Sequence, residues 1–159
     1  MYNKVVKKKK GNIRMVKEIW FDMDGTIADF YAVEGWENYL ENRFTFPYDT
    51  AKPMLNFNVL ARLLNKLQQN GYSIGIISWA SQNADDIYKK AIDDSKRKWL
   101  ATHLKSVKFD KIEVAAYGTP KEVGRKGILF DDNEGIRKAW GKGAFEPSEI
   151  IEVLKGLLK

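Results

Sequence analysis

The sequence predicts an α/β fold with a mainly parallel sheet and helices on both of its faces. From Met15 onward, short apolar runs alternate with amphipathic stretches, which is the pattern of strands linked by helical crossovers. The chain has 159 residues, enough for one domain with its own core. We therefore expect a three-layer, Rossmann-like arrangement.

Short apolar runs, rich in β-branched and aromatic residues, are the predicted strands. They cover residues 16–21, 72–78, 112–116 and 127–130, with a possible short strand near 144–145. Because parallel strands end at one edge of a sheet, a ligand is expected to bind there.

Amphipathic segments between these runs predict the helices. They are expected over residues 56–70, 84–104, 119–122, 133–140 and 148–158. Asn56 or Asn58 is suited to cap the first of them, and Thr119 with Pro120 suits a short helix start. The residues expected on the buried side of the longest helix are Ile87, Ala91, Trp99 and Leu100.

The excess positive charge lies at the start of the chain. The formal net charge is +6, and residues 1–14 contain six basic residues and no acidic one. The remaining 21 basic residues therefore balance the 21 acidic residues. We expect residues 1–14 to be a basic, flexible tail and residues 15–159 to be one domain. Nucleic acid is a possible partner of the tail and is not expected to bind the domain.

The composition excludes several kinds of site. Without cysteine there is no disulfide, thiol nucleophile or cysteine zinc site. The single His103 excludes a histidine-rich metal site, and we expect this residue to be structural or exposed. No segment resembles a signal peptide or a membrane span, so a cytoplasmic protein without a membrane partner is expected.

Two acidic residues follow the first predicted strand. Asp22 and Asp24 are two positions apart, which in an extended segment turns both side chains to one side. A turn at Gly25 can aim the second one inward. Carboxylates this close repel one another unless a cation or a shared proton compensates, and Mg²⁺ is suited to do so. The alternative interpretation of residues 22–25 is an acidic turn after a strand, with no role in binding a metal.

Further residues at the strand ends suit a magnesium and phosphate site. Ser78 ends the second strand, Lys121 precedes the fourth, and Asp131 and Asp132 follow the fourth. Alone, each has an ordinary interpretation as a turn, surface or helix-capping residue. Their coincidence at one edge of the sheet favours the functional interpretation.

The order of these motifs resembles the haloacid dehalogenase (HAD) superfamily of phosphotransferases. A strand leads to DxDGT at residues 22–26, a strand leads to Ser78, and Lys121 precedes a strand that leads to the DD pair. The resemblance spans about residues 16–135. It implies the HAD form of the Rossmann-like fold.

Within this superfamily the sequence is most similar to the 5'(3')-deoxyribonucleotidases. The lysine of the GTPK segment, Lys121, stands ten residues before Asp131 of the LFDD segment, as in that family, and the Lys98-Trp99-Leu100 stretch is also similar. Family members have a larger helical cap, whereas only about 25 residues separate Phe30 from Leu55 here. We therefore expect a reduced cap insert at about residues 30–54.

The resemblance implies a phosphomonoesterase that works through an aspartyl-phosphate intermediate. Asp22 would be the nucleophile, and Asp24 would be the general acid and base. Ser78 and Lys121 would bind the phosphoryl oxygens, with Lys126 as the next candidate for the lysine.

The resemblance also implies which residues bind metal and substrate. Mg²⁺ would be held by Asp22, the backbone carbonyl of Asp24, and Asp132, with Asp131 in support. Either member of the DD pair stays a candidate for the primary ligand. Gly25 and Thr26 would supply backbone N–H groups to the substrate.

Residues 30–48 hold seven of the 20 aromatic residues. Trp36, Tyr39, Leu40 and Phe44 recur at roughly helical spacing, which predicts a short amphipathic helix. These rings would either pack the cap onto the sheet or stack, together with Trp79, on a nucleobase.

The favoured function is therefore a 5'-nucleotidase or deoxyribonucleotidase-like hydrolase of nucleoside monophosphates. A phosphatase of nucleic-acid ends, or of another small phosphate ester, would use the same motifs. A catalytically silent HAD-like binding domain is the alternative of another class, and the complete motif set argues against it.

Overall fold

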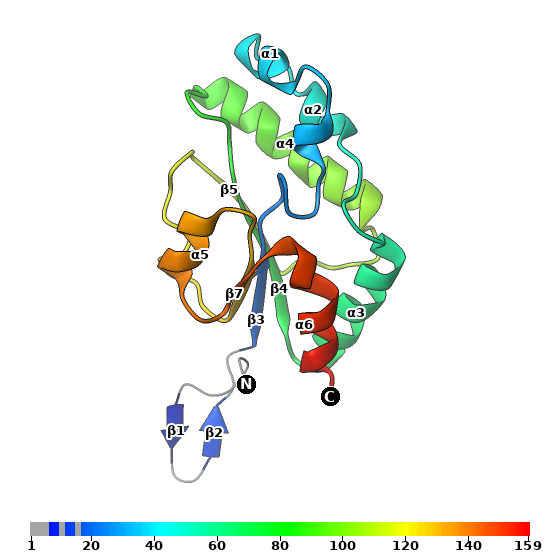
Figure 1. Cartoon of the computed structure of the whole chain (residues 1–159), viewed down its shortest axis with the longest axis vertical. Helices are drawn as coiled ribbons and strands as arrows, with labels where there is room; N and C mark the ends of the chain where they lie inside the picture. The colour runs from blue at the N-terminus through cyan, green and yellow to red at the C-terminus, as the bar shows by residue number, and fades with distance from the viewer. Residues whose placement is uncertain (1–6, 10–11, 15–16) are drawn as a thin grey trace.

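The computed structural model describes residues 7–9, 12–14 and 17–159. Its main sheet has five parallel strands in the order β5-β4-β3-β6-β7. The strands are β3 (Glu18–Phe21), β4 (Ser73–Trp79), β5 (Lys111–Ala115), β6 (Ile128–Phe130) and β7 (Ala144–Phe145). Helices lie on either side of this sheet (Figure 1). The predicted Rossmann-like α/β architecture is confirmed.

Six α-helices occur in the described residues, together with two short 3-10 helices. The α-helices are α1 (Trp36–Glu41), α2 (Phe46–Thr50), α3 (Phe57–Gln69), α4 (Asp86–His103), α5 (Glu134–Trp140) and α6 (Ile150–Leu157). The 3-10 helices are η1 (Phe30–Ala32) and η2 (Pro147–Glu149). In the part of the chain that the structure describes, no helix combines the length and the apolar character needed to cross a membrane.

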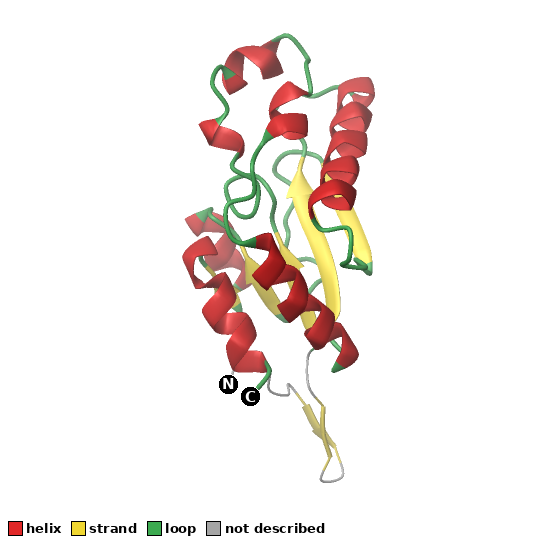
Figure 2. Ribbon diagram, turned by 90° about the vertical axis from the view of Figure 1, so that its right-hand side faces the viewer, coloured by secondary structure: helices red, strands yellow, loops and turns green. Residues whose placement is uncertain are grey.

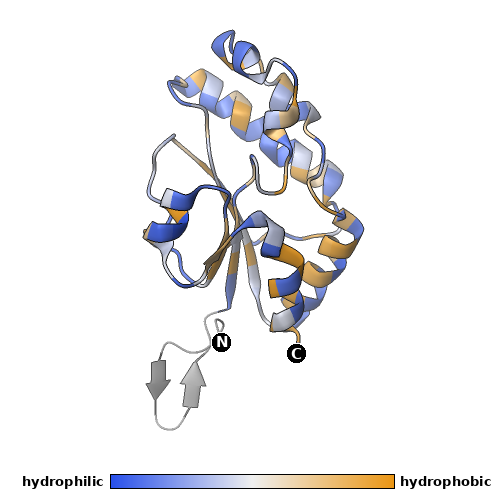
Figure 3. Ribbon diagram, viewed as in Figure 1, coloured by the Kyte–Doolittle hydropathy of each residue, from blue (hydrophilic) through white to orange (hydrophobic). Residues whose placement is uncertain are grey.

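The larger hydrophobic core lies on one face of the sheet. Alternate residues of the central strands point to this face because side chains alternate along a strand. They are Ile19, Phe21, Ile74, Ile76, Ile128 and Phe130. Against them pack α3 and α6, whose apolar residues are coloured orange in Figure 3. The side chain of Asn56 accepts hydrogen bonds from two N–H groups of the first turn of α3, so Asn56 is the cap.

A smaller cluster covers the opposite face. Trp20, Ile77 and Leu129 point to it and pack against the partly buried Ile136 and Trp140 of α5. Together the two clusters fix the sheet between layers of helices, and the carboxyl ends of the strands remain at one edge.

The first turn of α4 differs from the prediction. Ile87 is 84% exposed, so its predicted burial is wrong, whereas Ala91 is partly buried. The buried stripe of the helix consists of Tyr88, Ile92, Lys96, Trp99 and Leu100. Ile87 precedes this stripe by one residue, a rotation of about 100° that turns it to solvent.

The predicted helix over residues 119–122 is absent, and the segment is a loop of bends and turns. The Thr119 carbonyl accepts a hydrogen bond from Trp79 Nε1 at 2.8 Å. The Arg125 guanidinium donates to the Lys121 carbonyl at 3.0 Å. Side chains thus occupy carbonyl groups that a helix would use for its own hydrogen bonds, and the sequence motif gave no sign of these partners.

Residues 30–54, which we call the cap segment, contain η1, α1 and α2. These short helices lie beside α4 at the same end of the molecule (Figure 2). Helix α1 includes Trp36, Tyr39 and Leu40 but ends before Phe44, so the amphipathic helix is shorter than predicted. The limits of the cap insert and of the domain stay predictions.

Two unpredicted strands lie in the basic tail. β1 (Lys7–Lys9) pairs with β2 (Asn12–Arg14) in an antiparallel, two-stranded sheet. The remaining residues of the tail lie outside the described part of the chain, and its flexibility stays a prediction.

Candidate active site

A cavity of about 500 Å³ opens at the carboxyl ends of the strands, next to the cap segment. In open α/β sheets this edge is where ligands bind. The predicted site residues that line the cavity are Asp22, Asp24, Trp79, Lys121, Asp131 and Asp132. The fold therefore brings together residues that are as much as 110 positions apart in the sequence.

Asp22 follows β3 and is held at both of its carboxylate oxygens. Lys121 Nζ donates to Oδ1 at 2.9 Å, and the Thr26 hydroxyl donates to Oδ2 at 2.9 Å. The backbone N–H of Asp22 donates to the carbonyl of Phe130 on β6 at 3.0 Å. A carboxylate fixed in this way at a cavity wall is suited to attack a bound substrate in one orientation.

Lys121 is a buried cation between two carboxylates. Its ammonium donates to Asp22 and, at 2.7 Å, to Asp131 Oδ2. Burial by itself would lower the pKa of Lys121, but the charges of Asp22 and Asp131 outweigh it and raise the pKa above the ordinary value. Lys121 is therefore positively charged at neutral pH, and it is placed to attract the oxygens of a phosphate.

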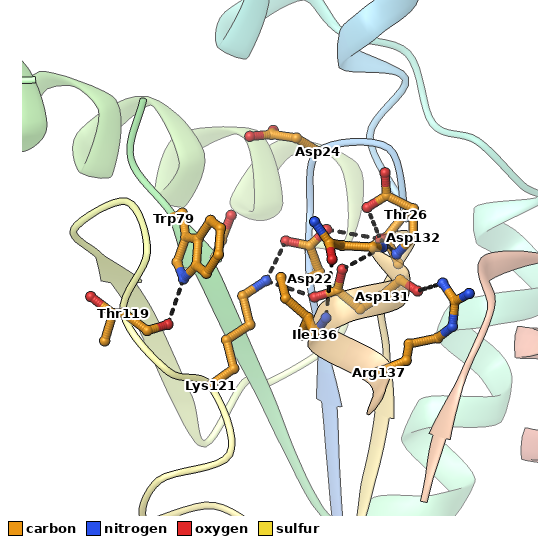
Figure 4. A network of polar contacts seen from close by, with 12 residues as sticks. Asp22, Asp24, Thr26, Trp79, Thr119, Lys121, Asp131, Asp132, Ile136 and Arg137 are labelled. Atoms are coloured by element: carbon orange, nitrogen blue, oxygen red, sulfur yellow. Dashed lines mark hydrogen bonds and ion pairs between the residues drawn. The ribbon is translucent and has the colours of Figure 1, made fainter. Parts of the chain in front are cut away.

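Three carboxylates meet beside Lys121 and form what we call the acidic cluster (Figure 4). One oxygen each from Asp22, Asp131 and Asp132 lies within 4.8 Å of the other two. Oxygen ligands of this charge and number fit Mg²⁺, which usually completes its shell with water.

The acidic cluster is electrostatically unfavourable without a cation. Burial, together with the charge of Asp22, raises the pKa of Asp131 to about 6 and that of Asp132 to about 7. The ionised forms are thus disfavoured in the folded state relative to the unfolded state. The free energy of unfolding of the metal-free chain should accordingly fall as the pH rises from about 4 to about 7.

We expect Mg²⁺ to raise the melting temperature more at about pH 7.5 than at about pH 5, because at the lower pH it must displace protons from the acidic cluster. Thermal unfolding with and without Mg²⁺ measures this difference. Asp132→Asn should lose most of the shift. Glu134→Gln, two residues away and outside the cluster, should keep it. An equal shift at both pH values would contradict the prediction.

The turn after Asp22 depends on Gly25 and Thr26. Gly25 has a φ of +80°, and a Cβ there would lie 2.5 Å from Asp132 Oδ2, so only glycine fits. The N–H groups of both residues donate to backbone carbonyls within the turn, at 2.9 and 3.0 Å. They are not free to bind a substrate, contrary to our prediction. Thr26 acts through its hydroxyl, which holds Asp22 and accepts the N–H of Asp132 at 3.2 Å.

We expect Gly25→Ala to destabilise the fold by about 1–3 kcal/mol and to weaken Mg²⁺ binding, because the new methyl group displaces Asp132. Gly124→Ala is the matched control: its φ is +77°, but nothing lies within 4 Å of the added Cβ. Urea unfolding and the Mg²⁺-induced melting shift separate backbone strain from displacement of the ligand. If both variants kept the full Mg²⁺ shift, the close approach would be irrelevant to the metal site.

Ser78 is fully buried and is not among the residues that line the cavity. Its Oγ accepts a hydrogen bond from Lys96 Nζ at 2.6 Å, and the same ammonium donates to Asp24 Oδ2 at 3.0 Å. Sequence reasoning did not single out Lys96, although it joins two predicted site residues. The sequence signal that could have identified Lys96 is its spacing: it lies four residues from both Ile92 and Leu100, on the buried stripe of α4.

Asp24 is separate from the acidic cluster. Its side chain extends away from Asp22, Asp131 and Asp132 (Figure 4). Burial raises its pKa above the ordinary value; Lys96 opposes this increase, and the charge of Asp22 adds to it. A carboxyl group whose pKa is raised keeps its proton to a higher pH than an ordinary aspartate, which suits Asp24 at the cavity wall to give and take a proton.

Aromatic rings form much of the remaining cavity wall. The cap segment contributes Phe30, Tyr31, Trp36 and Tyr48, and the carboxyl ends of β4 and β5 contribute Trp79 and Tyr117. The ring centres of Trp79 and Tyr117 are 4.9 Å apart, and Tyr117 is 54% exposed. The sequence did not point to Tyr117. Phe44 and Phe46 do not line this cavity and lie against Tyr39 instead.

Comparisons with known proteins bear on the fold. A scan against protein-family models and a search of curated proteins found no match. Among solved structures, the chain is similar to D,D-heptose 1,7-bisphosphate phosphatase from Burkholderia thailandensis, with a TM-score of 0.55 and 12% identity. The match covers 90% of this chain and 99% of that one. The chain therefore shares the α/β fold of that protein, with a five-stranded parallel sheet between helices. The resemblance to the HAD superfamily, and within it to the deoxyribonucleotidases, stays a prediction.

Proposed function

We propose that this HAD-like chain is a Mg²⁺-dependent phosphomonoesterase that works through an aspartyl-phosphate intermediate. The observation that carries the proposal is the fixed Asp22 carboxylate, bonded to the buried Lys121 and grouped with two further carboxylates at the wall of one cavity. A nucleophile, a phosphate-binding cation and a metal site are the parts that this chemistry requires.

Asp22, Lys121 and Asp24 have different roles in the reaction. Asp22 attacks phosphorus, and Lys121 balances negative charge on the phosphoryl oxygens. Asp24 gives its proton to the leaving oxygen and later removes a proton from the water that releases phosphate. Ser78 is buried and accepts a hydrogen bond from Lys96, which in turn donates to Asp24.

Asp22, Asp132 and the backbone carbonyl of Asp24 would hold Mg²⁺, with Asp131 in support. Asp131 is engaged at both oxygens, by Lys121 and by the N–H of Asn133 at 2.9 Å. The resemblance to the HAD superfamily favours Asp132 as the primary ligand of the pair. When bound, the ion would neutralise charge on the phosphate and help to orient it.

The substrate class that we propose is a nucleoside monophosphate. The cavity, with a volume of about 500 Å³, has space for more than a phosphate, and aromatic rings from the cap segment and from the ends of β4 and β5 line it. Such rings stack on nucleobases with a free energy of about 1–3 kcal/mol per base. A sugar phosphate, as in the name of the structural neighbour, or a nucleic-acid end would use the same catalytic residues. The cytoplasmic location also stays a prediction.

The test is Mg²⁺-dependent turnover of nucleoside monophosphates, ribose 5-phosphate and 5'-phosphorylated oligonucleotides. Trp79→Ala and Tyr117→Ala should each raise the KM for a nucleoside monophosphate by about 10-fold and change that for ribose 5-phosphate much less. Phe44→Ala is the control, because this exposed ring lies outside the cavity lining. Equal effects on both substrates would contradict base stacking. Preferred turnover of oligonucleotides, weakening with salt, would favour nucleic-acid ends.

A further inference from the structure

Lys96 is a buried lysine whose three donors all have fixed partners. It lies on α4 with 1% of its surface exposed. Its ammonium donates to Asp24 Oδ2 at 3.0 Å, Ser78 Oγ at 2.6 Å and the carbonyl of Trp79 at 2.8 Å. Lysine is seldom fully buried unless it is paired. Burying the ammonium costs free energy, and the fold places this buried charge next to a single carboxyl group, that of Asp24.

The position of Lys96 excludes direct contact with a substrate in this conformation. It is not among the residues that line the cavity, whereas Asp24 is. Two of its partners, Ser78 Oγ and the Trp79 carbonyl, belong to the carboxyl end of β4, which pairs with the central strand β3. The ring of Tyr48 from the cap segment lies 5.1 Å from the ammonium. The ammonium is thus held from the strand and from the cap, and it offers Asp24 one fixed contact.

We propose that Lys96 is the positioning residue that orients the Asp24 carboxyl group for proton transfer. With Oδ2 held by Lys96, Oδ1 would face the reacting oxygen in the cavity. Without the ammonium, the Asp24 side chain would lose this anchor and rotate away from that orientation. This inference rests on the proposed phosphatase function.

Misorientation of Asp24 would slow two steps of the reaction, because Asp24 transfers a proton in each of them. In the first step, an Asp22 oxygen bonds to phosphorus, the bond from phosphorus to the leaving oxygen breaks, and Asp24 gives its proton to that oxygen. In the second step, water bonds to phosphorus, the bond from phosphorus to Asp22 breaks, and Asp24 takes a proton from the water. Asp24 ends as it began, and both steps depend on where its carboxyl group points.

Substrates that differ in their leaving group distinguish positioning from a merely structural role. p-Nitrophenolate leaves without a proton, whereas the 5'-alkoxide of a nucleoside monophosphate needs one. Lys96→Met should therefore lower kcat/KM for the nucleoside monophosphate by about 100-fold or more and that for p-nitrophenyl phosphate only a few-fold. Because the second step is slowed for every substrate, p-nitrophenol should appear in a burst of about one equivalent per enzyme.

Lys98→Met on the exposed side of the same helix is the matched control and should behave as wild type. Lys96→Gln is the second variant, because its amide keeps a hydrogen-bond donor without the charge if Lys96→Met does not fold. Equal losses on both substrates with no burst, in whichever variant folds, would overturn the inference while the phosphatase function stood. A wild-type chain that hydrolyses neither substrate would overturn both.

Discussion

Asp22→Asn is expected to abolish phosphatase turnover, with a loss of about 10⁴-fold or more, while the fold is retained. The amide has nearly the same shape as the carboxylate but cannot form the aspartyl-phosphate. Asp22 also adds negative charge to the acidic cluster, so its neutralisation relieves repulsion of Asp131 and Asp132. Lys121 keeps its bond to Asp131 at 2.7 Å. The melting temperature of metal-free Asp22→Asn should thus equal or exceed that of the wild type.

Steady-state kinetics with Mg²⁺ and thermal unfolding without it measure the two halves of this prediction. Asp49→Asn, at an exposed carboxylate on α2 in the cap segment, is the matched control and should leave turnover unchanged. A folded Asp22→Asn protein with normal turnover would remove Asp22 from the mechanism.

Lys121→Ala is expected to reduce kcat/KM by about 100-fold or more, because the preorganised donor to the phosphoryl oxygens is lost. It should also destabilise the metal-free fold, by about 3–5 kcal/mol, because the change leaves Asp22 and Asp131 without their shared partner. Since the stability loss comes from carboxylate charge, Mg²⁺ should recover part of it.

The chain provides a close control in Lys126, the alternative lysine considered from the sequence. Lys126 is exposed, five residues from Lys121, so Lys126→Ala should leave activity and stability almost unchanged. Denaturant unfolding and kinetics, with and without Mg²⁺, compare the two variants. Loss of activity in Lys126→Ala together with normal activity in Lys121→Ala would reverse the assignment.

The strands of the sheet and much of the site were predictable because both depend on local patterns. Apolar runs gave the five strands of the main sheet to within about two residues, and the known behaviour of parallel sheets placed their ends together. That reasoning brought Asp22, Lys121 and the DD pair to one edge, where the structure has them. The tail strands β1 and β2 carried no such apolar pattern and were not predicted.

The other features depend on contacts between distant parts of the chain. Lys96 and Asp24 are 72 residues apart, and the sequence around Lys96 does not predict which residue it binds. The loop at Thr119 departs from helix because Trp79, 40 residues away, uses its carbonyl. Tyr117 reaches the cavity only because β5 lies next to β4. Local propensity predicts the elements, and tertiary contacts decide which polar side chains meet.

The most direct test of the aspartyl-phosphate mechanism is to trap the phosphoryl group on the protein. Enzyme turning over a substrate with Mg²⁺ is denatured rapidly and treated with borohydride, which reduces an acyl phosphate to the corresponding alcohol. Mass spectrometry of the peptide that contains Asp22 and Asp24 then locates the modified residue. We predict homoserine at position 22, dependent on substrate and absent from Asp22→Asn. Modification of Asp24 instead, or turnover without modification of any carboxylate, would contradict the mechanism.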